Sequence, residues 1–358
     1  MQKIFLDNNG TTQVAPEVVA IMLAELEIGP SNPSSIHSFG RAAHLRLTRA
    51  REQIASYLKV RPNELVFTAS GTEALNLAIL GLKSQGPIIS TEIEHAAVYH
   101  TLKRLNQPIH YLPVGKEGHI QIADLNKNVG LIVLSAVNSE TGVKNPIEEI
   151  AQFAERHQIP LIVDGVAWLG KEPISIPSGV TAMAFSGHKI HGPKGTGLLF
   201  VRKGCKLDPL LTGGGQEGMR RAGTENLPGI IGFAKAIELL EPVATNQMEK
   251  LRNLLESSLD GVIVNGTGPR ICNTSSLTFP GIDGEALLIQ LDLQGIAASM
   301  GSACSSGALE PSRVLLHMGL SNCEALSTIR FSLSRFTTEE EIRQVINKLC
   351  ALKLSSVR

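Results

Sequence analysis

Lys189 and Asp164 are the two residues whose types and positions could carry chemistry together. Lys189 ends the loop sequence Ser-Gly-His-Lys at 186–189, just past a predicted strand, and Asp164 ends the apolar run 160–164 one structural unit upstream. A lysine in such a loop can form a Schiff base, and a carboxylate at another strand end can pair with a pyridinium nitrogen, the two protein groups that pyridoxal phosphate (PLP) chemistry most needs. The pair therefore indicates a PLP-dependent enzyme, although Asp164 alone could also be a helix cap, a metal ligand or a solvated loop residue.

A phosphate-binding role is indicated for Gly71, Thr72 and Ser186. Gly71 and Thr72 open a predicted helix, in which Ser70 and Glu73 have the spacing of a capping box. Helix N-termini offer unsatisfied backbone N–H groups to anions, and Ser186, in the loop of the lysine, could add a hydroxyl donor. An ordinary helix start is the alternative for Gly71 and Thr72.

Cys304 is the candidate nucleophile. It lies in the segment 300–307, in which six of the eight residues are glycine, alanine or serine. Such a loop has little to pack and is expected to expose the thiol, as a nucleophilic cysteine requires; a chance free cysteine is the alternative. The four other cysteines lie in apolar or helical settings and are better explained as structural residues.

His95 and Arg330 are candidates for proton transfer and for substrate binding. His95 follows a predicted strand, where an imidazole could stack on a planar cofactor and move protons near neutral pH, although a lone histidine is more often structural. Arg330 alternates with apolar residues along the predicted strand 328–333 and so points away from their buried face. A guanidinium fixed on a strand suits bidentate capture of a substrate carboxylate; a surface salt bridge is the alternative.

Bringing these residues together requires a mainly parallel α/β sheet. Helical periodicity at 16–28, 40–60 and 147–157 alternates with short apolar runs. Strands are expected at 87–91, 131–137, 161–166, 181–186 and 197–202. This alternation argues for a sheet that helices cover on both faces, and open parallel sheets bind ligands at the carboxyl ends of their strands.

The pattern changes after about residue 240, where a long helix and short alternating segments replace the strand–helix alternation. We therefore expect two domains. A large PLP-binding domain is predicted over residues 16–240, and a smaller α+β domain is predicted from residues 1–15 and 241–358, which carry the Cys304 loop.

The composition is that of a globular protein from a reducing compartment. The chain has 358 residues, of which 43% are hydrophobic and 18% charged, and its 33 basic and 33 acidic residues balance. That balance gives no indication of binding to nucleic acid or to an anionic membrane. No apolar run approaches a membrane span, and the first residues lack the zones of a signal peptide. The five cysteines are scattered without metal-ligand spacing, so we expect a cytoplasmic protein with free thiols and no stable metal site.

Taken together, these residues resemble the cysteine desulfurases of the NifS/IscS type, within the class-V aminotransferase superfamily and PLP fold type I. The resemblance extends nearly from end to end and rests on an ordered series of motifs. The motifs are Leu6-Asp-Asn-Asn-Gly-Thr-Thr12, Asn32-Pro-Ser-Ser-Ile-His37, Thr72-Glu73, Glu94-His95, Val137-Asn138, Ser186-Gly-His-Lys189, Gly213-Gly-Gly-Gln-Glu217, Arg220-Arg-Ala-Gly-Thr-Glu-Asn226, Gly301-Ser-Ala-Cys-Ser-Ser306 and Ile329-Arg-Phe-Ser-Leu333.

The resemblance implies a role for each matching residue. Lys189 would hold the cofactor through the Schiff base, and Asp164 would pair with its ring nitrogen. Thr224 would reach the phosphate of the partner subunit, which implies a homodimer with shared active sites. The remaining cofactor-binding residues would be His95, stacked on the ring, Gly71, Thr72, Ser186 and His188 around the phosphate, and Asn138.

The implied reaction converts L-cysteine to L-alanine, with Lys189, Cys304 and His95 as the catalytic residues. Asn138 and Arg330 would hold the substrate carboxylate. The Cys304 thiolate would take the sulfur as a persulfide, and its loop resembles the longer type that hands sulfur to an iron–sulfur scaffold or another carrier protein. In such a transfer Cys304 could be a transient cluster ligand.

Ala167 departs from the family pattern, in which the residue three past the aspartate is usually a glutamine that binds the phenolic oxygen of the cofactor. Trp168 beside it is bulkier than expected, and Gly10 and Ser334 stand where alanine and glycine are common. Two alternatives follow. The chain could act on another amino acid, such as selenocysteine or cysteine sulfinate, or it could be a degenerate homologue that serves as a binding partner.

Overall fold

The computed structural model describes residues 3–240, 243–301 and 310–356. Its centre is a seven-stranded sheet in the order β2-β8-β7-β6-β5-β3-β4. In that order the strands are Leu65–Thr68, Gly197–Val201, Ala182–Ser186, Leu161–Asp164, Leu131–Ser135, Ile88–Thr91 and Ile109–Leu112. Neighbouring strands are parallel, except that β8 runs antiparallel to both β2 and β7. The predicted α/β class with a mainly parallel central sheet is confirmed.

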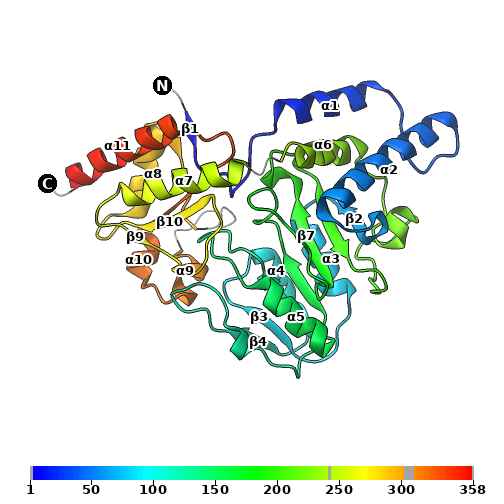
Figure 1. Ribbon diagram of the computed structural model, residues 1–358, viewed down its shortest axis with the longest axis horizontal. Coiled ribbons are helices and arrows are strands. Elements are labelled where there is room, and N and C mark those ends of the chain that lie inside the picture. Colours follow the sequence, from blue (N-terminus) through cyan, green and yellow to red (C-terminus); the bar gives the residue numbers. More distant parts are fainter. Residues whose placement is uncertain (1–2, 241–242, 302–309, 357–358) are drawn as a thin grey trace.

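Helices cover both faces of this sheet (Figure 1). One face carries α1 (Pro16–Glu27), α2 (Ser38–Leu58), α5 (Ile147–His157) and α6 (Leu227–Glu238), and the other carries α3 (Gly71–Gly81) and α4 (Ala96–Leu102). Residues of each strand alternate between the two cores: in β5, Ile132 and Leu134 pack with the first group of helices, and Leu131 and Val133 pack with the second. Burial on both faces explains why the central strands appear in the sequence as continuous apolar runs.

A second part of the molecule lies beside the central sheet and has a core of its own (Figure 1). It contains an antiparallel sheet in the order β12-β10-β9 and a parallel pair of β1 with β11. Its elements are β1 (Ile4–Phe5), α7 (Val243–Ser257), β9 (Ile263–Val264), β10 (Thr274–Thr278), α8 (Gly284–Leu293), β11 (Ile296–Ala297), α10 (Asn322–Leu326), β12 (Thr328–Ser332) and α11 (Glu339–Ser356). Between them along the chain, α9 (Arg313–His317) packs through Val314 against the core of the central sheet. The chain start contributes Ile4 and Leu6 to this core. The separate core favours the predicted domain division, whose boundaries stay a prediction.

Two strands and one helix cap differ from the sequence-based expectations. The edge strands β2 and β4 are missing from the predicted set; β4 is only partly buried and so lacks a continuous apolar run, whereas β2 is buried along its length. Ser70 caps α3 as expected, since its Oγ accepts the Glu73 N–H at 3.1 Å. The Glu73 carboxylate, however, accepts the N–H of Ala69 and pairs with Arg221, both at 2.8 Å. The predicted capping box is therefore only half formed.

Candidate active site

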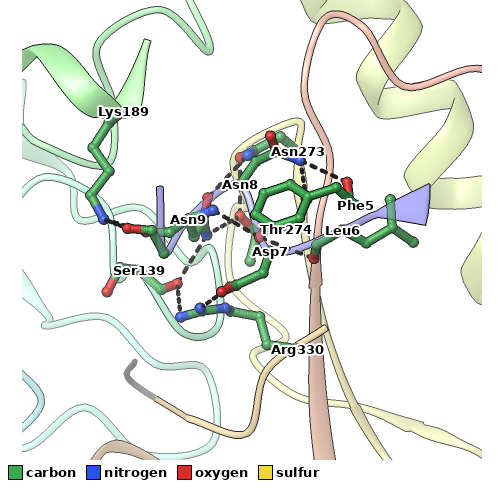
Figure 2. Close-up of polar contacts among 12 residues, drawn as sticks. Phe5, Leu6, Asp7, Asn8, Asn9, Ser139, Lys189, Asn273, Thr274 and Arg330 are labelled. Atoms are coloured by element: carbon green, nitrogen blue, oxygen red, sulfur yellow. Dashed lines mark hydrogen bonds and ion pairs between the residues drawn. The ribbon is translucent and has the colours of Figure 1, made fainter. Parts of the chain in front are cut away.

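Lys189 and Asp164 lie at the carboxyl ends of neighbouring strands. Asp164 ends β6, and Lys189 follows the end of β7 in a 3₁₀ turn. The Lys189 ammonium donates to the backbone carbonyls of Asn9 and Gly10, the latter at 2.8 Å (Figure 2). Residues 7–12, called here the N-terminal strap, therefore run directly against the candidate cofactor lysine.

The surroundings of Asp164 suit a cationic partner. Its carboxylate is buried, and Oδ1 accepts the N–H of Val166 at 3.0 Å. Burial raises the pKa of Asp164 above its ordinary value, and the charges on His95 and Lys189 offset part of that rise. The structure thus brings the predicted aspartate, histidine and lysine within electrostatic reach of one another. A protonated ring nitrogen beside Asp164 would restore the charged carboxylate that burial disfavours.

His95 is also the N-terminal cap of α4. Its Nδ1 accepts the N–H of Ala97 at 3.1 Å, which leaves Nε2 as the protonated nitrogen of the neutral ring. His95 therefore has a structural role as a helix cap and also lies near Asp164. A ring fixed through Nδ1 is oriented before any ligand arrives.

Glu94, beside His95, is a buried carboxyl that belongs to a motif of the resemblance but was given no role from the sequence. It is completely buried and accepts hydrogen bonds from the Thr91 hydroxyl at 2.7 Å and from the Ser135 N–H at 2.8 Å. Burial raises the pKa of Glu94 to about 7, and the charge on Asp164 contributes to the rise. The group is therefore partly protonated near neutral pH.

We expect the Glu94→Gln substitution to change how stability depends on pH. Because the folded-state pKa is raised from 4.5 to about 7, the stability that this carboxyl contributes is complete at low pH and is lost as pH rises through 7. Relative to wild type, Glu94→Gln should therefore gain on the order of 2 kcal/mol in unfolding free energy between about pH 5 and pH 8. Urea unfolding at both pH values measures the gain, with the exposed Glu148→Gln as the control. A constant difference between Glu94→Gln and wild type would contradict the prediction.

A buried hydroxyl without a partner marks the predicted phosphate site. Ser186 is 2% exposed, and its Oγ has no hydrogen-bond partner among the described residues. Gly71 lies close by, since a Cβ there would be 2.7 Å from Val166 Cγ2 and 3.5 Å from Ser186 Cβ. Buried hydroxyls normally have partners, and the first N–H groups of α3, including that of Thr72, have none within the helix. A phosphate group would accept hydrogen bonds from the Ser186 hydroxyl and from these N–H groups.

His188, two residues after Ser186, has a neutral imidazole near pH 7. Its Nδ1 is 3.1 Å from Thr11 Oγ1. Burial, reinforced by the charge on Lys189, lowers the pKa of His188 to about 4, so the ring can offer a neutral hydrogen-bond donor to an anion near pH 7. Thr224 lies exposed in the loop that precedes α6, and its predicted contact with a partner subunit stays a prediction.

Arg330 forms a buried ion pair. It is 2% exposed, its Nη2 pairs with Asp7 Oδ1 at 2.7 Å, and its Nη1 donates to the Ser139 carbonyl at 3.2 Å (Figure 2). The alternative of a surface salt bridge is wrong in one respect: the ion pair exists, but its guanidinium is buried and its carboxylate is only partly exposed. A buried guanidinium is fixed in orientation, which favours the predicted carboxylate-binding role.

The Asn138 side chain organises its own loop. Its Oδ1 accepts the N–H groups of Glu140 and Thr141 at 2.9 and 3.0 Å, and its Nδ2 donates to the Ile93 carbonyl at 2.9 Å. One of the two amide hydrogens is used in that bond, so the other can serve a ligand. The predicted contacts of Asn138 with cofactor and substrate stay a prediction.

Cys304 lies outside the described residues, but the chain on either side of it reaches the site. A Cβ at Gly301 would be 3.5 Å from Glu140 Oε2, and the Ser312 hydroxyl donates to that same carboxylate oxygen. Glu140 follows Asn138 in the same loop. Both ends of the predicted Cys304 loop therefore approach the loop that carries Asn138.

Lys171 is a second buried charge that sequence reasoning missed. Its ammonium donates to the Lys189 carbonyl at 2.6 Å, and burial lowers the pKa of Lys171 to about 8. It lies in the segment that also contains Ala167 and Trp168, whose indole Nε1 has no partner within the described part of the chain. No periodicity distinguishes Lys171 from a surface lysine, so only its position near Asp164 could have drawn attention to it.

Comparisons with known proteins agree with this geometry. The family model "Aminotransferase class-V" matches residues 4–345. A cysteine desulfurase of Trichormus azollae is 43% identical over 97% of this chain and 92% of its own length. Among solved structures, a NifS-like protein superposes with a TM-score of 0.90 at 34% identity, covering 97% of this chain and 98% of that one. SspA in complex with cysteine superposes with a TM-score of 0.83 at 32% identity, covering 94% and 100%.

Proposed function

Since the chain belongs to the class-V aminotransferase family, and within it to the cysteine desulfurases, we propose that Lys189, Asp164 and Ser186 hold PLP. Enzymes of this family depend on that cofactor. The single observation that carries the proposal is the convergence of a lysine amine, a buried carboxylate and an unpartnered buried hydroxyl at the ends of β6 and β7. The amine, the carboxylate and the hydroxyl would bind the carbonyl, the ring nitrogen and the phosphate of the cofactor, respectively.

Each residue of the site would have its own role in the reaction of the substrate. When bound, PLP supplies an electron sink for the carbon that carries the substrate amine. Lys189 would remove the proton from that carbon once its amine is released, and the Asn9 and Gly10 carbonyls would hold the amine in place. Asp164 would keep the ring nitrogen protonated. His95, fixed by its bond to the backbone of α4, would stack on the ring and move protons.

Sulfur transfer would use Cys304. Its thiolate attacks the sulfur of L-cysteine, so that an S–S bond forms while the substrate C–S bond breaks. The electron pair of that bond remains on carbon, which takes up a proton and becomes the methyl group of L-alanine. Only the thiolate is a good nucleophile, so this step requires prior loss of the thiol proton. The persulfide on Cys304 would then pass to a sulfur-acceptor protein, such as an iron–sulfur scaffold or a thiolation carrier.

We also propose a homodimer in the cytoplasm. Large apolar side chains are exposed on α1, at the start of α2 and in the segment between β8 and α6, as expected for surfaces that a second subunit covers. They include Leu23, Leu26, Ile36, Phe39, Leu210, Leu211 and Met219. Within the described ranges, no helix is both long and apolar enough to cross a bilayer.

Replacing Ser186 by alanine should weaken cofactor binding about ten-fold. A hydrogen bond to a charged group is worth about 1.5–3 kcal/mol, and 1.4 kcal/mol corresponds to a factor of ten in affinity. Fluorescence or absorbance titration of apo-protein with PLP measures the dissociation constant. Ser178→Ala, whose hydroxyl binds Glu155 at the surface, is the matched control, and equal affinities for wild type and Ser186→Ala would remove Ser186 from the phosphate site.

Chemical trapping tests the proposed cofactor site directly. Borohydride reduction of the PLP-loaded protein, followed by peptide mapping, should place the pyridoxyl group on Lys189. Lys171 is the discriminating alternative, because it is buried next to Lys189 and its pKa is lowered to about 8. Label on Lys171 or on no lysine would refute the proposed site.

A further inference from the structure

Asp7 and Arg330 form an ion pair whose guanidinium is buried. Arg330 lies on β12 and Asp7 begins the N-terminal strap, and the two residues are 323 positions apart in the sequence. Asp7 Oδ1 binds Nη2 of the guanidinium at 2.7 Å, and the Ser139 carbonyl binds Nη1 at 3.2 Å (Figure 2). Acceptors on both terminal nitrogens fix the plane of the guanidinium.

The hydrogen bonds to Asp7 and Ser139 do not use every N–H group of the Arg330 guanidinium. A guanidinium has five N–H donors, and the hydrogen bonds to Asp7 and Ser139 use two of them. The Nε atom is buried and has no hydrogen-bond partner among the residues that the structure describes. Nε therefore remains a buried donor for which the described residues supply no acceptor, as expected of a group that serves a ligand.

The N-terminal strap connects the Asp7–Arg330 ion pair to Lys189. Asn9 donates from Nδ2 to the same Ser139 carbonyl that Arg330 binds, at 2.9 Å, and its own carbonyl accepts the Lys189 ammonium. Asp7 and Asn9, two residues of one short segment, thus contact Arg330 and Lys189 respectively (Figure 2). An amino acid substrate must present its carboxylate at one end and its amine at the other.

Gly10 makes room for the Asp7 carboxylate. A Cβ at Gly10 would lie 2.4 Å from Asp7 Oδ2 and 3.0 Å from its Cγ, which is closer than van der Waals contact allows. Alanine at this position would therefore push the carboxylate away from its present place. Gly10 does not have the positive φ that only glycine adopts readily, so the substitution strains the Asp7 side chain rather than the backbone.

We propose that Asp7 is a positioning residue for the substrate carboxylate: it fixes the orientation of the Arg330 guanidinium, which would bind that carboxylate. The inference rests on the proposed function and deepens it. Asp7 touches neither cofactor nor substrate but acts through Arg330. A competing role, in which Asp7 only neutralises Arg330 and must be displaced by the substrate, predicts the opposite effect on affinity.

Two amines that differ by one carboxylate test this role. L-Alanine and ethylamine are titrated into PLP-loaded protein, and their dissociation constants are read from the change in visible absorbance. For Asp7→Ala we expect the L-alanine constant to rise at least about ten-fold and that of ethylamine to change less than about two-fold. Gly10→Ala, which keeps the carboxylate but shifts it, should show the same selective loss at about three-fold. The control Glu256→Gln breaks the Arg270–Glu256 pair (2.6 Å) and should leave both constants unchanged.

Each result decides the matter. Unchanged or tighter L-alanine binding in Asp7→Ala would overturn the positioning role, and so would an equal loss for both amines, which indicates a general structural defect. If Asp7→Ala does not fold, the selectivity of Gly10→Ala decides alone. A wild-type protein that binds PLP with no visible band would instead overturn the proposed function, and this inference with it.

Discussion

Replacing Lys189 by alanine should lower the turnover of L-cysteine by at least about a thousand-fold, because one amine would both anchor the cofactor and move the substrate proton. The same change should abolish the visible absorbance of the protein-bound cofactor. The ammonium already lies between the Asn9 and Gly10 carbonyls and near Asp164, so no other described amine is placed in the same way. Absorbance after extensive dialysis and alanine production are measured on the same preparation.

The matched control for this substitution is Lys203→Ala. Lys203 is exposed and follows β8, which runs antiparallel to β7 and therefore ends at the opposite edge of the sheet. The Lys203→Ala protein should retain both the visible absorbance of the bound cofactor and the turnover of L-cysteine. A dialysed Lys189→Ala protein with an unchanged visible band would contradict the role of this lysine.

Replacing Cys304 by alanine should separate cofactor chemistry from sulfur transfer. We expect the visible band to remain and the release of sulfide from L-cysteine to fall at least about a hundred-fold, because the sulfur then has no thiolate acceptor. Sulfide and alanine are quantified together with the spectrum. Cys323→Ala is the control, since Cys323 is exposed at the start of α10 and has no proposed role. Undiminished turnover in Cys304→Ala would rule out the persulfide mechanism.

Residues at strand ends could be predicted from the sequence because their placement follows from local pattern. Asp164 and Lys189 each follow an apolar run, and parallel strands bring such positions to one edge of a sheet. The structure places them at neighbouring strands, together with His95. Fold class and the sheet's principal strands follow from the same alternation, whereas the four-residue edge strand β4, with its partial burial, gives no such signal.

Contacts between distant segments could not be predicted in this way. The Asp7–Arg330 pair joins positions 323 apart, and the Lys171 ammonium reaches the Lys189 carbonyl across 18 positions that include β7. Nothing in the type or spacing of Arg330 and Lys171 indicates that they are buried, because burial depends on how the two cores pack together. The resemblance identified the motif that contains Asp7, but only the structure shows which group its carboxylate binds.

Ala167 has less effect on the functional conclusion than the sequence alone suggested. Cysteine desulfurases are among the relatives that match nearly the whole chain, and the candidate residues for the ring nitrogen and the phosphate, Asp164 and Ser186, are both buried. The missing glutamine concerns only the donor to the phenolic oxygen. The absorbance of the bound cofactor is therefore the property in which this chain should differ from relatives that keep the glutamine.

The most direct test of the account is to give the purified, PLP-loaded protein L-cysteine together with a reductant and to quantify alanine and sulfide in the same sample. Desulfurase chemistry at Lys189 and Cys304 predicts a yellow protein that forms the two products in equal amounts over many turnovers. A yellow protein that forms neither alanine nor sulfide from L-cysteine would contradict the proposed reaction.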